Sequence, residues 1–215
     1  MSEGITKDFE KIAPKHWKRY PFYKDSGIEW IGEIPEGWDL IKVKYLSEIK
    51  SGDFLPSEEM SNLFKYPVIG GNGVLGYSGK TNSHGECVVI GRVGAKCGNI
   101  HLVKESAWIT DNALILKPSC AVSIGYLAYS LDSLHLNQFS SQNAQPLITG
   151  TQVKEALIAI PSLEEQRLIH LSLSNYLSKI DILISKKQRL IELLKEKRAA
   201  IISRAVTKGL DPNAP

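Results

Sequence analysis

The chain lacks any long apolar run and has little cysteine. No stretch approaches 18 consecutive apolar residues, so we expect no membrane-spanning helix. The opening Met1-Ser2-Glu3-Gly4 lacks the apolar core of a signal peptide, and we therefore expect a cytoplasmic protein. The three cysteines, Cys87, Cys97 and Cys120, form no CxxC or Cys/His zinc pattern, so buried, reduced thiols are expected.

The chain also lacks a strong excess of charge of one sign. Its formal net charge is only +3, and residues 51–162 carry seven basic and eight acidic side chains. This balance argues against a protein that binds nucleic acid by electrostatics alone. Within that segment, however, residues 65–104 contain five basic side chains and one acid, Glu86. A patch of this size is suited to phosphate contacts, although a solvated face without a partner explains the same pattern.

Two glycine motifs lack the context that their nucleotide-binding counterparts need. Gly71–Gly76 fits GxGxxG, but a dinucleotide site needs a helix directly afterwards and an acid about 20 residues further on. Here Tyr77-Ser78-Gly79 follows, and residues 87–104 contain no acid. Gly79-Lys80-Thr81 resembles the end of a P-loop, but Val74 occupies the position of its first glycine. We therefore interpret these glycines as tight turns in a β-rich region.

No combination of residues predicts catalysis convincingly. Asp39, Glu48 and Lys50 have the outline of a magnesium-dependent nuclease cluster, and this hypothesis stays open, although so short a match arises easily by chance. The chain contains no Asn/Asp-Pro-Pro-aromatic tetrapeptide, so adenine amino-methylation is not assigned to it. The five histidines show no ligand spacing; they are His16, His84, His101, His135 and His170. The sequence therefore indicates a recognition protein rather than an enzyme.

The absence of both proline and glycine over Leu163–Thr207 predicts one continuous helix. At 1.5 Å per residue it would be about 65 Å long, against an average of about 11–12 residues for a globular helix. Ser162 is a candidate N-cap, and Gly209 and Pro212 mark the end. A helix of this length is expected to lie against another long helix.

A heptad-like seam runs along this predicted helix. Lys187 and Lys197 interrupt it, and such polar positions can fix register at some cost in stability. We expect the seam to contact a second long helix from another copy or another chain, although packing on the chain's own domain is the alternative. The apolar seam residues are Leu173, Tyr176, Leu177, Ile180, Leu183, Ile184, Leu190, Ile191, Leu194 and Ile201.

The rest of the chain reads as an α+β domain. Residues 24–38 form an irregular segment rich in glycine and proline, and residues 40–49 suggest a strand that leads into a short helix. A helix is expected over Val122–Phe139, then a polar loop over Ser140–Gly150. Further strands are expected at 67–69, 87–90, 100–103, 113–116 and 156–160.

Three segments carry a family resemblance. They are Ile34-Pro35-Glu36-Gly37-Trp38, Pro161–Arg167 and Lys197–Gly209. In this order they resemble the specificity (S) subunit of type I restriction–modification systems. Between them, the turns at 67–70, 90–94 and 110–113 occur where target recognition domains of that family carry similar turns. The resemblance covers roughly residues 24–212.

The resemblance implies a division of the chain into four parts. S subunits usually carry two target recognition domains, each followed by a long helix, and the two helices run antiparallel. This chain would have an N-terminal arm at 1–23, one recognition domain at 24–162, one long helix at 163–207 and a linker or tail at 208–215. It is then either a natural half-length subunit or a piece of a longer one. In both cases a two-fold dimer would supply the missing helix.

The resemblance also implies a function. Two identical domains related by a two-fold axis would read an interrupted palindrome in double-stranded DNA. Methyltransferase (M) subunits would bring S-adenosylmethionine and methylate adenine, and restriction (R) subunits would use ATP and magnesium; none of these cofactors is expected on this chain. The alternatives are a structural adaptor, an anti-restriction-like protein that binds the M subunit, and the nuclease mentioned above.

Residue type selects the candidate DNA contacts. Arginine and lysine suit guanine and phosphate, and asparagine and glutamine suit adenine. The loop-borne candidates are Lys65, Asn72, Lys80, Asn82, Arg92, Lys96, Asn143 and Gln145.

Overall fold

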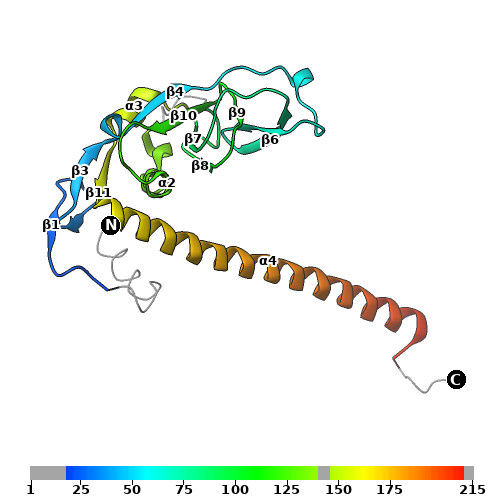
Figure 1. Ribbon diagram of the computed structural model, residues 1–215. Coiled ribbons are helices and arrows are strands. Elements are labelled where there is room, and N and C mark those ends of the chain that lie inside the picture. Colours follow the sequence, from blue (N-terminus) through cyan, green and yellow to red (C-terminus); the bar gives the residue numbers. More distant parts are fainter. Residues whose placement is uncertain (1–17, 140–145, 211–215) are drawn as a thin grey trace. The chain divides into compact units, whose positions relative to one another are not determined.

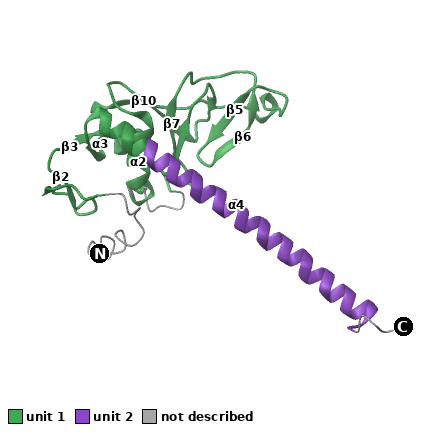
Figure 2. Ribbon diagram, turned by 60° about the horizontal axis from the view of Figure 1, so that its bottom comes forward, with its two compact units in different colours: residues 1–170 green, residues 171–215 purple. Residues whose placement is uncertain are grey.

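A computed structural model describes residues 18–139 and 146–210. The chain divides into two compact units, Met1–His170 and Leu171–Pro215 (Figure 2). The described strands, the two shorter α-helices and about two turns of the long helix belong to the first unit. The second unit contains the remainder of the long helix. The α+β fold class predicted from the sequence is confirmed.

The centre of the first unit is a four-stranded antiparallel sheet of order β4-β10-β7-β8 (Figure 1). Its strands are β4 (Ser47–Ser51), β10 (Ala113–Pro118), β7 (Cys87–Gly91) and β8 (Ile100–Val103). The strands expected at 87–90, 100–103 and 113–116 are therefore confirmed. All of β7 and four of the six residues of β10 are buried. Both faces of the two inner strands are covered, which explains their unbroken apolar sequences.

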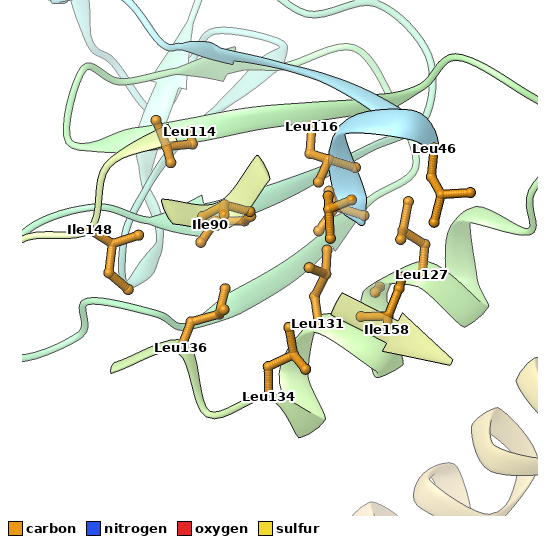
Figure 3. Packing of buried hydrophobic residues seen from close by; sticks show 14 of the residues in the cluster. Leu46, Ile90, Leu114, Leu116, Leu127, Leu131, Leu134, Leu136, Ile148 and Ile158 are labelled. Carbon is orange, nitrogen blue, oxygen red and sulfur yellow. The ribbon is translucent and has the colours of Figure 1, made fainter. Parts of the chain in front are cut away.

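One face of this sheet packs against helix α2 (Ile124–Ser133). Alternate residues of the inner strands point to this side and meet apolar residues of the helix (Figure 3). Ile90, Leu114 and Leu116 come from the sheet, and Leu127 and Leu131 come from α2. Each of these five side chains is at most 3% exposed. This cluster is the main hydrophobic core of the first unit.

The other face of the same sheet packs against a second, three-stranded sheet of order β6-β5-β9. It consists of β6 (Gly73–Ser78), β5 (Tyr66–Gly70) and β9 (Trp108–Ile109), with β5 antiparallel to β6 and parallel to β9. The remaining residues of the inner strands, such as Val89 and Ile115, meet Ile69 and Ile109 here. The domain is therefore a sheet covered by helices on one side and by a smaller sheet on the other.

Two short strand pairs and several short helices complete the unit. Strands β1 (Tyr23–Asp25) and β2 (Glu33–Pro35) pair antiparallel, as do β3 (Asp39–Lys42) and β11 (Leu157–Ile160). Helix α3 (Gly150–Glu155) ends at Glu155, whose carboxylate lies 2.7 Å from the Nζ atoms of both Lys42 and Lys44. These hydrogen bonds lower the pKa of Glu155 to about 2. The 3-10 helices are η1 (Val43–Tyr45), η2 (Ser57–Glu59) and η3 (Leu136–Phe139).

Several local predictions need correction. The segment 24–38, expected to be irregular, contributes to the β1–β2 pair. The helix expected to reach residue 139 ends at Ser133, and a turn with His135 at φ 46° precedes η3. Helix α3 was not predicted; its capping box between Thr149 and Gln152 is the local signal for it.

The cysteine prediction is correct for two of the three thiols. Cys87 and Cys97 are buried and unpaired, and burial raises the pKa of both. Cys120 is exposed, because it follows β10 in the turn before α2 rather than lying within a covered strand.

The predicted long helix is α4 (Leu163–Lys208). The Oγ of Ser162 accepts a hydrogen bond from the Glu165 amide at 3.3 Å, and Gly209 follows the helix at φ +73°. Of the ten predicted seam residues, Leu173 is half-buried and the other nine are 36–59% exposed. Among the described residues, no helix combines the length and apolarity that crossing a bilayer needs.

Candidate nucleic-acid interface

Four loops meet where strands of the two packed sheets end. The Gly52 amide donates to the Ala113 carbonyl at 3.0 Å, the Arg92 amide to Asn112 at 2.9 Å, and the Thr110 amide to Ile69 at 2.9 Å. We call this assembly the loop cluster and define it as residues 51–53, 70–73, 91–99 and 110–112. The four loops come together because strands β4, β5, β7 and β9 end at them and strand β10 begins directly after the last of them.

Glycine makes the close contacts of the loop cluster possible. A β-carbon on Gly91 would lie 2.4 Å from the carbonyl oxygen of Lys96 and 2.9 Å from that of Gly71. A β-carbon on Gly71 would lie 3.1 Å from the Cα of Gly91. The two backbones therefore cross where neither has a side chain. The sequence prediction of tight turns explained these glycines only in part, because the crossing joins loops about 20 residues apart.

We expect Gly91→Ala to disrupt the loop cluster while Gly37→Ala does not. The new methyl group would meet two backbone oxygens at 2.9 Å or less, which only a backbone shift can relieve. We expect a loss of about 1–3 kcal/mol in unfolding free energy, as for other overpacked sites. Gly37 is exposed, and its β-carbon would have no neighbour within 4 Å. Urea unfolding of both variants checks this; equal stability of the two would contradict the crossing.

Arg92 is the best-positioned cation in the loop cluster. Its Nη1 donates to the Ser51 Oγ at 3.2 Å, and its carbonyl accepts from the Ile148 amide at 2.9 Å. Its Nε and the Oγ1 of Thr110 are buried without a hydrogen-bond partner among the residues that the structure describes. A guanidinium has five N–H donors. Arg92 therefore keeps donors for a ligand while its backbone and one Nη atom are held by hydrogen bonds. Such fixing is suited to directional hydrogen bonding.

Of the residues predicted to contact DNA, three lie together in the structure and two others lie apart from them. Asn72 is exposed in the turn between β5 and β6, and Lys96 is exposed in the β7–β8 loop, so both belong to the loop cluster with Arg92. Lys65 and Lys80 lie at the opposite end of the β5–β6 pair. The Nζ of Lys80 is 2.6 Å from a Glu59 carboxylate oxygen, and that of Lys65 is 5.3 Å from the centre of the Tyr66 ring.

Asn82 is bonded within the domain. Its Nδ2 donates to Asp53 Oδ2 and to the Ile109 carbonyl, both at 2.8 Å, and its Oδ1 accepts from the Ile109 amide at 2.7 Å. These bonds hold the end of β9 in place. Asn143 and Gln145 lie outside the described residues.

Sequence reasoning missed Asn112, which is exposed in the loop cluster and whose carbonyl receives the Arg92 amide. It also missed His101, whose Nε2 lies 3.3 Å from the Gly71 carbonyl oxygen. Asn112 belongs to the turn at 110–113, but no local signal in the sequence joins this turn to Arg92.

A second apolar stripe on α4 was also missed. Leu171, Ile182 and Leu193 are 58%, 53% and 46% exposed. They are spaced by eleven residues, which is close to three full turns, so they share one side of the helix. Ile182 is about 200° around the helix from the seam residue Ile180. The helix therefore has apolar side chains on two nearly opposite sides.

The residues of the GxGxxG and nuclease motifs lie in or next to β-strands. Residues 73–78 form strand β6, so the GxGxxG pattern is not followed by a helix. Asp39 pairs with Ile160 in one sheet, whereas Glu48 and Lys50 pair with residues of β10 in another. Within residues 18–139 and 146–210, no group of three His, Cys, Asp or Glu residues is arranged to hold a metal ion.

Comparison with known proteins identifies the family. The model of the type I restriction modification DNA specificity domain matches residues 35–193, which include the domain and much of α4. The chain belongs to this family. The match to the type I specificity family confirms the resemblance found in the sequence.

Individual relatives agree with this assignment. The chain is 29% identical over 154 residues to the type I restriction enzyme EcoprrI specificity subunit of Escherichia coli, covering 69% of this chain and 38% of that protein. The solved S subunit of the type I restriction–modification system of M. genitalium is 20% identical with a TM-score of 0.61, over 78% of this chain and 45% of the other.

Two further structures share the fold. One comes from work on complex assembly and conformational transition of the type I R-M system; it is 21% identical with a TM-score of 0.69, over 87% of this chain and 49% of the other. The HsdS subunit of Thermoanaerobacter tengcongensis is 21% identical with a TM-score of 0.60, over 87% and 48%. The chain thus spans less than half the length of these relatives.

Proposed function

We propose that the chain is the DNA-reading subunit of a type I restriction–modification complex and has no chemistry of its own. The observation that carries this proposal is the family match over residues 35–193, which includes the loop cluster. Arg92, Asn72 and Lys96 are the side chains we assign to base edges and phosphates, with Asn112 as an additional contact. We assign Lys65 and Lys80 to phosphate contacts farther along the duplex.

Two copies of the chain pair through the seam of α4. The nine exposed seam side chains support this, because isolated apolar stripes of such length are unfavourable in water. Helix α4 has 46 residues and is therefore about 70 Å long. Antiparallel pairing places a recognition domain at each end and produces an interrupted palindrome as the target. The gap between the half-sites then depends on the length of the helix.

The second stripe of α4 is the surface we assign to the methyltransferase subunits. Leu171, Ile182 and Leu193 face away from the seam, so a dimer leaves them accessible to a different helix. The M subunits bring S-adenosylmethionine and methylate adenine, and R subunits add ATP- and magnesium-dependent cleavage. The complex acts on DNA in the cytoplasm.

One experiment distinguishes a DNA-reading subunit from a structural adaptor. It measures methylation by the methyltransferase subunit with and without this chain. We expect methylation of a defined duplex sequence only when both are present. Methylation that is independent of sequence, or of the chain, would favour the adaptor. The exposed apolar side chains of Phe54, Val74 and Leu75 are a feature that an adaptor could use for protein binding.

A further inference from the structure

One residue of α4 differs from the rest of the helix. Gln166 is the residue of α4 that is buried, and it is 2% exposed. Its side-chain Nε2 donates to the Pro161 carbonyl at 2.9 Å, and its Oε1 accepts from the Ser123 amide at 2.9 Å. Ser123 is the N-cap of α2, so the amide of Gln166 joins the first turn of α4 to the start of α2.

Further aromatic and polar contacts lie beside the first turn of α4. The hydroxyl of Tyr126 donates to the Ala159 carbonyl at 2.6 Å, and its ring meets Trp38 edge-to-face at 6.5 Å. Burial raises the pKa of Tyr126 to about 12. The Tyr20 hydroxyl donates to the carboxylate of Glu165. Pro161 after β11, Ser123 at the start of α2 and Tyr20 in the N-terminal segment therefore all contact the first turn of α4, and Tyr126 ties α2 to β11 beside it.

A glycine provides the room for the next turn. A β-carbon on Gly125 would lie 2.2 Å from two ring atoms of His170. The His170 ring thus lies directly on the backbone of α2. Its centre is 5.6 Å from the centre of the Tyr129 ring. We define the joint as the contacts of Gln166 with Ser123 and Pro161, of Tyr126 with Ala159, and of His170 with Gly125. All of its residues belong to the first compact unit.

Hydrogen bonds make such a joint more directional than apolar packing would. A buried amide has one geometry in which both its donor and its acceptor are satisfied, and leaving either unpaired costs about 1–3 kcal/mol. Apolar side chains instead tolerate small shifts at little cost. Direction matters here because the helix is long. A change of about 10° at the start of a 70 Å rod moves its far end by roughly 12 Å, which is about three to four base pairs of duplex.

We propose that Gln166 is a positioning residue that fixes the direction in which α4 leaves the recognition domain, and thereby selects one spacing between the two half-sites. This inference rests on the proposed function. In this proposal the loop cluster recognises the sequence of each half-site, and the joint determines the gap between the half-sites. Mutations should therefore separate the two properties.

The test compares Gln166→Met with Gln188→Met in the complex with the methyltransferase subunit. Methionine keeps the length of the side chain and removes both hydrogen bonds, and Gln188 is an exposed residue of the same helix. The substrates are duplexes with the wild-type half-sites separated by the wild-type gap or by gaps up to four base pairs shorter or longer. The readout is the rate of adenine methylation for each gap.

We expect the wild type and Gln188→Met to prefer one gap. For Gln166→Met, the ratio of the methylation rate at the preferred gap to the rate at other gaps should fall at least 10-fold. The variant should still methylate the same half-site sequence. Tyr126→Phe, which removes the hydroxyl that donates to Ala159, should reduce the gap preference by a smaller factor, and its gap preference decides the matter if circular dichroism shows Gln166→Met to be unfolded. An unchanged gap preference in the folded variants would overturn the inference alone. A wild-type complex without any sequence preference would overturn the proposed function instead.

Discussion

Replacing Leu183 and Ile184 with glutamate is expected to convert the chain from a dimer to a monomer. Both side chains lie in the seam and are 56% and 48% exposed in the single chain. Burying a leucine or isoleucine contributes about 1.5–3 kcal/mol, and a two-fold dimer contains each position twice. The dimer would also have to bury four glutamates in the seam. We therefore expect the dissociation constant to rise by more than about 1,000-fold, which is about 4 kcal/mol.

Sedimentation equilibrium measures this change, and Ile182→Glu is its matched control. Ile182 is 53% exposed and adjacent in sequence, but it belongs to the second stripe. We expect Ile182→Glu to remain dimeric and to bind the methyltransferase subunit less tightly. A wild-type chain that is monomeric at all accessible concentrations, or a double variant that stays dimeric, would show that the seam does not pair two copies.

The second large effect is expected at Arg92. A bidentate contact between arginine and guanine contributes about 1–3 kcal/mol of discrimination, and a dimer makes the contact twice. Arg92→Ala should therefore weaken binding to the target duplex by about 30-fold to 20,000-fold at fixed salt. Arg92→Lys should restore only part of the loss, because lysine lacks the rigid planar fork of the guanidinium.

Competition binding of the assembled complex, with target and scrambled duplexes, measures the effect of Arg92→Ala. Lys154→Ala is a control with the same change of charge, because Lys154 is exposed on α3 rather than in the loop cluster. A loss confined to the target duplex identifies Arg92 as a base contact, and an equal loss on both duplexes identifies a phosphate contact. Unchanged binding to both would remove Arg92 from the interface.

The elements that depend on local pattern were predictable from the sequence. Apolar runs such as Cys87-Val88-Val89-Ile90 indicated buried strands, and the structure shows why they do not alternate: helices cover one face and a second sheet the other. The long helix followed from the absence of proline and glycine between Ser162 and Gly209; its predicted start at Leu163 is correct, and its predicted end at Thr207 is one residue short.

Features that depend on contacts between distant segments were not predictable. The carbonyl of Asn112 fixes the Arg92 amide across 20 residues, and the Gln166 side chain reaches Ser123 across 43. Neither pairing leaves a periodic signal. Asn82 shows the converse problem: its residue type suggested a DNA contact, yet its amide is bonded to Asp53 and Ile109. Residue type identifies which side chains are able to bind a base, but only the fold determines which of them are available.

The most direct test of the central claim is a map of methylated adenines made with this chain as the sole specificity subunit beside its methyltransferase partner. If two copies pair through α4, the modified sites consist of one short sequence, a fixed gap and the same sequence inverted. A reproducible site with two different halves, or methylation without a common sequence, would contradict the pairing of two identical reading domains.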